Sequence, residues 1–167
     1  DTDTDTDTDT DTDTDTDTDT GDTGDSGFEG DTALYGYRGE AEVVAGESYS
    51  GWEDLYFRNV ALGGDLCVYR WDAEDSATLT SCADCSWAFT VEMTPNAYTV
   101  NNHDSCPPEA DLALPAPYNY GFGQYEMNEV MYDVLNYEYD GTWSAVAIAE
   151  YNGTSFSYDW IIGLVAL

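Results

Sequence analysis

Apolar and polar residues alternate in two segments of the chain, and this alternation predicts β-strands. Trp, Phe, Val and Met occupy every second position from residue 87 to residue 93. Phe156, Tyr158 and Trp160 alternate with polar residues in the same way. Successive side chains of a strand point to opposite faces, so a period of two is typical of a strand with one buried face.

Turn signals between alternating segments predict a β-meander toward the C-terminus. Asp140-Gly141 and Asn152-Gly153 are dipeptides typical of hairpin turns, in which glycine supplies the positive φ of a type I′ turn. They predict three strands near residues 129–139, 142–151 and 154–164. The preceding sequence predicts earlier strands around residues 33–45, 49–60, 65–72, 76–81 and 97–101.

One segment is also compatible with a helix. Apolar residues with the spacing of an amphipathic helix lie between positions 127 and 135, namely Met127, Val130, Met131, Val134 and Leu135. Three nearby tyrosines and the following Asp-Gly turn favour a strand instead. The proline-rich run 107–117 is expected to be a loop or an edge crossing, because proline cannot donate to a ladder. The predicted fold is an all-β, disulfide-stapled antiparallel β-sandwich of about eight strands.

Composition divides the chain into a tail and a domain. Residues 1–20 are ten uninterrupted Asp-Thr dipeptides, and the first 27 residues contain 12 aspartates and no apolar side chain. Such a segment cannot bury a core, so it is expected to be extended. Every aromatic, cysteine and proline residue follows it. We therefore expect a low-complexity tail over 1–30 and one β-domain over 31–167.

The charge of the chain excludes several function classes. It contains 35 acidic residues against three arginines and no lysine, for a formal net charge of −32. Such a polyanion repels phosphate backbones and anionic lipids, so no nucleic-acid or membrane-surface partner is expected. No stretch approaches the roughly 20 apolar residues of a membrane-spanning helix. The chain starts at Asp1 without an apolar leader, so we expect a mature product or a fragment.

The four cysteines are predicted to form two structural disulfides. Cys67, Cys82, Cys85 and Cys106 are an even set in a small chain with an extracellular composition. The preferred pairing joins Cys67 with Cys82 and Cys85 with Cys106. A zinc site is an alternative, because Cys82 and Cys85 have the spacing of a metal knuckle. A redox CxxC motif is a third, although such a motif normally opens a helix.

The sequence contains no pattern that points to catalysis. His103 is the only histidine and lies in a loop-like run, where a solvated side chain is expected. The 23 acids that follow residue 27 offer many carboxylate pairs for glycoside hydrolysis, and for that reason no pair stands out. Motifs of serine hydrolases, phosphate-binding loops and zinc proteases are absent. We therefore expect no enzyme, and we predict no catalytic, cofactor-binding or metal-binding residue in the domain.

The Asp-Thr tract presents a regular array of side chains. In an extended backbone, all threonines share one face and successive hydroxyls are about 6.6 Å apart. This array predicts O-glycosylation, as in threonine-rich stalks. Weak Ca²⁺ binding by the aspartates and a plain solvated spacer are the alternatives. The predicted O-glycosylation sites are the even-numbered threonines Thr2, Thr4, Thr6, Thr8, Thr10, Thr12, Thr14, Thr16, Thr18 and Thr20.

Residues 1–26 resemble the Asp-Thr stalks of secreted bacterial proteins and surface lipoproteins. The domain contains Asp65-Leu66-Cys67, Cys82-Ala-Asp-Cys85-Ser-Trp87-Ala-Phe89, Trp143 and Tyr158-Asp159-Trp160. On these residues it resembles the domains that are found behind such stalks. The Asp-Thr tract also resembles microbial glycofibrils, whose peptide repeats carry O-linked glycans. These resemblances imply an extracellular or cell-surface protein, with covalent glycans and self-association into a fibre.

Two functions from different classes follow from the sequence. The first is a structural fibre or stalk protein whose threonines carry glycans and whose β-domain serves as cap, anchor or assembly module. The second is a surface domain that binds carbohydrate or a protein and is carried on an acidic spacer. The 14 tyrosines and five tryptophans suit carbohydrate stacking, but they also suit an ordinary core.

The last eight residues, Trp160 to Leu167, are apolar on both alternating faces. A final strand buried on both sides of its own sandwich would account for this pattern. A strand that completes the sheet of a neighbouring subunit is the alternative, because strand addition supplies main-chain hydrogen bonds and side-chain pockets.

Overall fold

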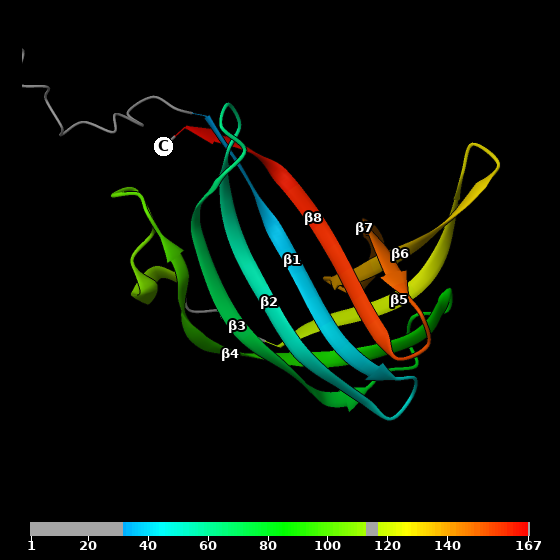
Figure 1. Cartoon of the computed structure of the whole chain (residues 1–167). Coiled ribbons are helices and arrows are strands. Elements are labelled where there is room, and N and C mark those ends of the chain that lie inside the picture. Colours follow the sequence, from blue (N-terminus) through cyan, green and yellow to red (C-terminus); the bar gives the residue numbers. More distant parts are fainter. Residues whose placement is uncertain (1–31, 113–116, 167) are drawn as a thin grey trace, which may run out of the picture.

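The computed structural model describes residues 32–112 and 117–166, which form an eight-stranded antiparallel β-barrel (Figure 1). Each strand pairs with the next along the chain, and β8 pairs with β1 to close the barrel. The strands are β1 (Thr32–Val44), β2 (Ser48–Asn59), β3 (Asp65–Thr78), β4 (Cys85–Asn101), β5 (Tyr118–Met127), β6 (Val130–Tyr139), β7 (Thr142–Tyr151) and β8 (Ser155–Ala166).

The predicted sandwich is therefore wrong, although the all-β, antiparallel class is correct. The β1–β8 pairing runs from Thr32 opposite Ala166 to Glu42 opposite Ser155. It joins the first strand to the last, so the eight strands form one closed sheet and not the two packed sheets of a sandwich. A sandwich and a barrel both alternate inward and outward residues along each strand. The hydrophobic pattern is the same for both, and only the long-range pairing of β1 with β8 distinguishes them.

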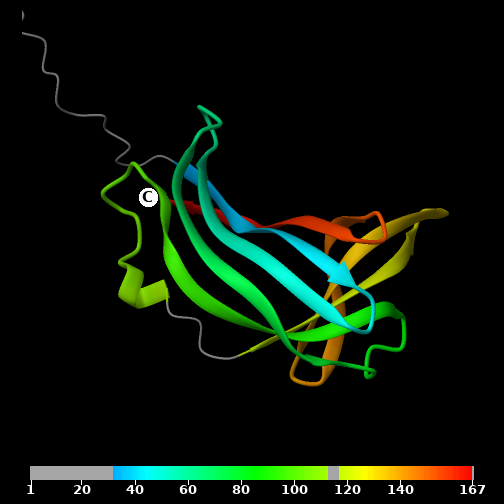
Figure 2. The ribbon, with the colours of Figure 1, turned by 60° about the horizontal axis from the view of Figure 1, so that its bottom comes forward.

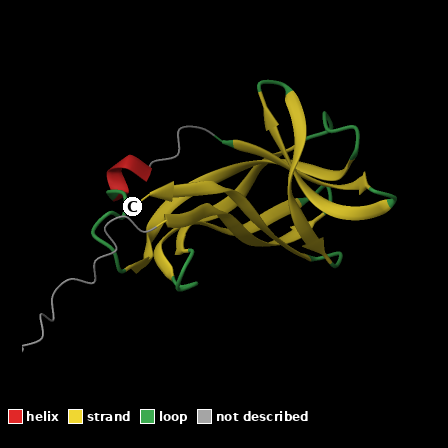
Figure 3. Ribbon diagram, turned by 90° about the horizontal axis from the view of Figure 1, so that it is seen from above, coloured by secondary structure: helices red, strands yellow, loops and turns green. Residues whose placement is uncertain are grey.

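The barrel splits toward one end. β7 pairs with β8 only from Ile148 to Tyr151, and β4 pairs with β5 only from Cys85 to Val91. Beyond these points β8 continues along β1, and β4 continues along β3. The sheet β8-β1-β2-β3-β4 therefore diverges from β5, β6 and β7 (Figure 2). A 3-10 helix, Glu109–Leu112, lies at the end where β8 finishes (Figure 3).

The hairpin predictions are confirmed with one difference in turn geometry. Asp140 and Gly141 have φ of 51° and 76°, as a type I′ turn requires. At the second turn only Gly153 has a positive φ, and the side chain of Asn152 accepts hydrogen bonds from the backbone of Thr154 and Ser155. The segment that also fits a helix forms strand β6.

Two boundaries differ from the sequence prediction. The two strands predicted at 65–72 and 76–81 largely coincide with one long strand, β3. Likewise, the alternating segment 87–93 and the strand predicted at 97–101 are both part of β4. Strand β5 was not predicted, because glycines occupy its outward positions 121 and 123 and weaken the pattern. A Cβ on Gly121 would lie 2.6 Å from the sulfur of Cys85, so the close approach of β4 requires glycine there.

Aromatic side chains fill the closed part of the barrel. Tyr49, Trp87, Phe89 and Phe156 are buried together with Leu135. The ring centroids of Trp87 and Phe156 lie 5.0 Å apart in an edge-on arrangement. Eight strands enclose an interior just wide enough to be filled by side chains or to hold one small ligand. Whether the barrel has free interior space therefore depends on the side chains that lie inside it at the end where the strands diverge.

The prediction of two disulfides is confirmed, but the preferred pairing is wrong. Cys67 is bonded to Cys106, with Cα atoms 5.7 Å apart, and Cys82 is bonded to Cys85. Cys67 lies opposite Asn101 at the end of β4, so the loop that follows β4 brings Cys106 to it. Cys82 and Cys85 flank the turn before β4. Since none of the four is free, they do not form the alternative zinc site.

Strand β8 belongs to its own barrel, but only one of its faces is buried near the end. Val165 packs against a cluster that contains Ala33, Leu66 and Cys67. Ile161 and Leu164 point outward, and Leu164 is 65% exposed. The expectation of a strand buried on both sides is therefore wrong, because no layer formed by residues 32–112 or 117–166 covers the outward side chains of Ile161 and Leu164.

The predictions for the tail fall outside the described residues. They include the boundary at residue 30, the O-glycosylation of Thr2 to Thr20 and Ca²⁺ binding by the aspartates. Across residues 32–112 and 117–166, no helix is long and apolar enough to cross a membrane.

Candidate functional site

Two consecutive acids on β2, Glu53 and Asp54, are both buried and point to opposite faces of the barrel wall. Glu53 is 2% exposed and Asp54 is 1% exposed. The inward positions of β2 include Tyr49, Glu53 and Leu55, so Glu53 occupies a place in the strand where an apolar residue is the rule. The alternation of β2 thus directs one carboxylate into the barrel and the next toward its outer surface.

Inside the barrel, two tyrosine hydroxyls hold the carboxylate of Glu53. The hydroxyl of Tyr120 on β5 donates to Oε2 of Glu53 over 2.8 Å, and the hydroxyl of Tyr158 on β8 donates to the same oxygen. No hydrogen bond from the described residues reaches the other oxygen, Oε1. The two tyrosines therefore share one carboxylate oxygen, and the other oxygen accepts neither of these hydrogen bonds.

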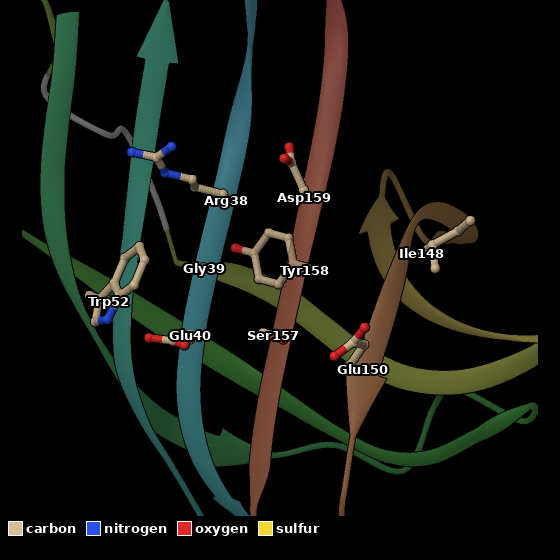
Figure 4. A pocket seen from close by; sticks show the side chains of 9 residues that line it. All are labelled: Arg38, Gly39, Glu40, Trp52, Ile148, Glu150, Ser157, Tyr158 and Asp159. Carbon is tan, nitrogen blue, oxygen red and sulfur yellow. The ribbon is translucent and has the colours of Figure 1, made fainter. Parts of the chain in front are cut away.

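A glycine allows Tyr158 to reach Glu53. Gly39 on β1 lies directly between them, opposite Glu53 on one side and opposite Tyr158 on the other. The ring of Tyr158 extends from β8 across Gly39 (Figure 4). A Cβ on Gly39 would lie 2.7 Å from that ring, so a larger residue would displace the tyrosine. This requirement for close approach explains a glycine in the middle of a long strand.

Next to Glu53 lies a cavity of about 170 Å³ with mostly aromatic walls. Tyr37 and Trp160 are cross-strand neighbours with ring centroids 6.0 Å apart, and Trp160 lies 5.7 Å from Tyr137. Glu53 and Tyr120 are buried, whereas the other lining side chains are partly exposed, so the cavity extends from the buried acid toward the split end. Its lining residues are Tyr37, Glu53, Tyr118, Tyr120, Tyr137 and Trp160. We call this set the aromatic cavity.

Burial controls the ionisation of the site. It raises the pKa of Glu53 to about 7, against the lowering effect of the hydrogen bonds from Tyr158 and Tyr120. Burial and the nearby Glu53 also raise the pKa values of Tyr120 and Tyr158 well above the usual range, so both remain hydroxyl donors at neutral pH. No arginine in the described part of the chain forms an ion pair with Glu53.

On the outer face, all three arginines of the chain gather around Asp54 and Tyr56. Arg70 donates from Nε to Oδ1 of Asp54 over 2.7 Å and from Nη2 to Oδ2 over 2.9 Å. The guanidinium carbons of Arg38 and Arg58 each lie 5.2 Å from the ring centroid of Tyr56. The positive charge of the domain is thus used on the outside of the barrel, and none of it neutralises Glu53.

A larger hollow of about 530 Å³ lies on the outer surface beside this cluster (Figure 4). Its walls include Arg38, Trp52 and Ile148, together with the exposed carboxylates of Glu40 and Glu150. Arg38 already contacts Asp54 and Asp65. Because the remaining charges face water, interactions with them are screened and weak. The smaller interior cavity therefore provides the stronger recognition chemistry.

Within the described part of the chain, the residues singled out by sequence do not come together as a site. His103 lies in the loop after β4, where its Nδ1 accepts a hydrogen bond from the backbone N–H of Ser105. Among the described residues, no group of three His, Cys, Asp or Glu side chains could hold a metal ion. Glu53 was not predicted from the sequence as a site residue. A signal for it existed, because an acidic residue at an inward position of a strand is unusual and indicates a buried carboxylate.

Comparison of the chain with protein-family models, with curated proteins and with solved structures finds no match.

Proposed function

We propose that the barrel is a binding module that takes up a small molecule, or one end of a larger one, in the aromatic cavity. The observation that carries this proposal is the convergence of a buried carboxylate and five aromatic side chains around free interior space. Ligand sites are typically concave, mostly apolar and furnished with a few well-placed polar groups. The aromatic cavity has this composition, and it lies where the two parts of the barrel separate.

The organisation of the chain supports the same proposal. A binding domain gains reach when an extended segment holds it away from a surface, and the acidic tail suits the role of such a spacer. The two disulfides suit an extracellular location, because disulfides persist in oxidising compartments. We therefore propose that this is an extracellular or cell-surface binding domain on an Asp-Thr stalk, and that it is not an enzyme.

Filling the cavity tests the proposed function. Tyr137→Trp adds volume inside the cavity, and Tyr139→Trp makes the same change two residues along β6 at a side chain that is 75% exposed. Ligand-observed NMR with a mixed set of cationic, neutral and anionic small molecules should detect binders that Tyr137→Trp loses and Tyr139→Trp keeps. If no molecule in the set binds, or if every binder is retained by Tyr137→Trp, the proposal is wrong.

A second candidate function is self-association into a fibre, with O-glycosylated threonines along the stalk. One observation favours it: the edge of β8 beyond Asp159 has no partner strand on the β7 side within the described residues, and Ile161 and Leu164 are exposed beside it. The variant Ile161→Asp/Leu164→Asp should lower the mass found by sedimentation if β8 joins copies, whereas Leu62→Asp, at another exposed site, should not. Hexose-scale mass increments on residues 1–26 would support the glycan assignment.

A further inference from the structure

We propose that the aromatic cavity selects a small protonated primary amine, with the ammonium group between the aromatic rings and Oε1 of Glu53. This inference rests on the proposed function and names the ligand class of the same site. Three features of the cavity carry it: the acceptor that the protein leaves available, the aromatic walls and the lack of a basic group among the described residues that line it.

The first feature is the acceptor geometry of Glu53. Tyr120 and Tyr158 both donate to Oε2, which fixes the carboxylate while Oε1 receives no hydrogen bond from the described residues. An acceptor of this kind requires a ligand that donates. A charged N–H donor forms a shorter and stronger hydrogen bond to a carboxylate than a neutral donor does. The geometry therefore favours an ammonium group over an alcohol.

The second feature is the arrangement of the rings. Tyr137 lies 5.7 Å from Trp160, 5.8 Å from Tyr118 and 6.0 Å from Tyr120, measured between ring centroids. Aromatic faces attract cations within about 6 Å of the ring centroid, most strongly when the cation is out of water. These separations are those of rings in direct contact, so the rings form one continuous wall of the cavity that Glu53 also lines. An ammonium ion held against this wall is attracted both by the ring faces and by the carboxylate.

The third feature is the charge around the cavity. Arg38, Arg58 and Arg70 are held on the outer face by Asp54 and Asp65, so no cation competes for Glu53 from within the described residues. Residues 28–167 contain 23 acidic and three basic residues, and this charge raises the local concentration of cations while it repels anions. Fatty acids, phosphates and other anionic ligands are disfavoured for the same reason.

The size of the cavity limits the ligand. Its volume of about 170 Å³ is comparable with that of an engineered protein cavity of about 150 Å³ that holds one benzene molecule. It is well below the roughly 300–1,000 Å³ typical of sites for drug-sized ligands. A short alkylammonium ion, or the aminoalkyl end of a longer molecule, matches this volume.

The test compares n-butylammonium with 1-butanol, its neutral counterpart of similar size, by isothermal titration calorimetry on the full chain in physiological salt. We expect one binding site and at least about tenfold tighter binding of the ammonium ion. Equal binding of 1-butanol would overturn the inference but leave the proposed function standing. If neither these probes nor the molecules of the mixed set bind, both proposals fail.

Two matched pairs of variants locate the site. Glu53→Gln and Glu92→Gln remove the same charge, but Glu92 is exposed on the outer side of β4. Tyr137→Leu and Tyr139→Leu remove the same ring from inside and outside the cavity. Butylammonium binding should weaken at least about tenfold in the first member of each pair and stay unchanged in the second. Equal loss in Glu92→Gln would indicate diffuse attraction to the acidic chain and would overturn the inference.

Affinity should also depend on pH in a defined direction. Tyrosines from five strands surround Glu53 inside the barrel, namely Tyr37 on β1, Tyr49 on β2, Tyr118 and Tyr120 on β5, Tyr137 on β6 and Tyr158 on β8. The charge of Asp54 acts on Glu53 from the outer face, and burial raises the pKa of Glu53 to about 7. Butylammonium stays charged between pH 8 and pH 5.5, so a change in affinity over this range reports the ionisation of the protein. Its affinity should fall at least about tenfold between pH 8 and pH 5.5. An affinity that is constant over this range would contradict the role of the carboxylate.

A quaternary ion tests the role of Oε1. Tetramethylammonium has the charge that the rings attract but no N–H to donate, so it should bind more weakly than butylammonium. Tighter binding of tetramethylammonium would overturn the assignment to a protonated amine, because the rings alone would then account for recognition.

Discussion

Glu53 and Asp54 are neighbours in sequence and equally buried, yet the barrel treats them in opposite ways. Asp54 on the outer face receives two hydrogen bonds from Arg70 and an ion pair from Arg38. Glu53 on the inner face receives only tyrosine hydroxyls from the described residues. Burying a carboxylate is costly unless its charge is compensated or the group takes up a proton. Asp54 illustrates the first solution, and the raised pKa of Glu53 illustrates the second.

This contrast suggests a division of roles between the two faces. The outer cluster consists of the three arginines with Asp54, Tyr56 and Asp65. It links β1, β2 and β3 through charges that are already paired. Oε1 of Glu53 accepts no hydrogen bond from the described residues, and Glu53 lines the aromatic cavity. A purely structural ion pair would not need such an acceptor. Variants at Asp54, Glu53, Gly39 and Arg58 test this division.

Breaking the outer cluster should destabilise the fold most. Asp54→Ala removes two charge-assisted hydrogen bonds from Arg70, whose side chain is 32% exposed, and the loss of such bonds to a buried carboxylate costs about 3 kcal/mol. Urea unfolding of Asp54→Ala should show this loss in the free energy of unfolding. Glu42→Ala, an exposed position on neighbouring β1, serves as the control and should change stability little. Similar values for the two variants would mean that the cluster is not a stabilising element.

Glu53 should make stability fall as pH rises, in contrast to an ion-paired acid. Its pKa is about 7 in the folded protein against an ordinary 4.5, so the folded state keeps a proton that the unfolded chain releases between these values. The free energy of unfolding contributed by this group therefore decreases by about 3 kcal/mol from pH 4.5 to pH 7 and is constant above that range.

The difference in stability between the wild-type protein and Glu53→Gln should reproduce this profile, since glutamine cannot titrate. Glu92→Gln is the matched control, because it makes the same charge change at an exposed position. Parallel pH profiles for the wild type and Glu53→Gln would show that Glu53 is not the buried acid that titrates near neutrality.

Gly39→Ala should disturb the inner site alone. Its new Cβ would meet the ring of Tyr158 at 2.7 Å, and such overpacking typically costs about 1–3 kcal/mol. Because the displaced ring also donates to Glu53, the variant should alter the pH dependence of stability as well as its magnitude. Gly64→Ala is a suitable control, since a Cβ at that position would have no atom within 4 Å and its φ lies outside the left-handed region. A Gly39→Ala protein with unchanged pH dependence would contradict the coupling.

Arg58, the most exposed arginine of the outer cluster, should contribute least to the free energy of unfolding. Arg58 pairs with Asp65 over 2.9 Å and stacks on Tyr56, but its side chain is 37% exposed. Exposed ion pairs and cation–π contacts are each worth about 0.5–1 kcal/mol, so Arg58→Met should lower the free energy of unfolding by about 1 kcal/mol. Raising the salt concentration should reduce the difference from the wild type. A loss as large as that of Asp54→Ala would mean that the cluster acts as one unit.

The local pattern of the sequence determined the strand class and much of the strand arrangement. Alternation and turn chemistry are local properties, so the β6–β7 and β7–β8 hairpins could be predicted from the Asp-Gly and Asn-Gly turns. The even number of cysteines in a chain of this composition predicted their oxidation. Strand β5 escaped prediction because glycines interrupt its outward face where β4 approaches closely.

Only the tertiary structure decided the closure, the disulfide partners and the site. The pairing of β1 with β8 joins residues more than a hundred positions apart, and nothing in a local alternation specifies a partner at that distance. Cys67 meets Cys106 because the register of β3 and β4 brings the start of β3 next to the end of β4, and Cys106 follows in the next loop. Glu53 becomes a candidate site because β1, β5, β6 and β8 each bring aromatic rings to it across the barrel. Sequence placed an acid at an inward position of a strand, and the closure of the barrel made it a buried carboxylate beside a cavity.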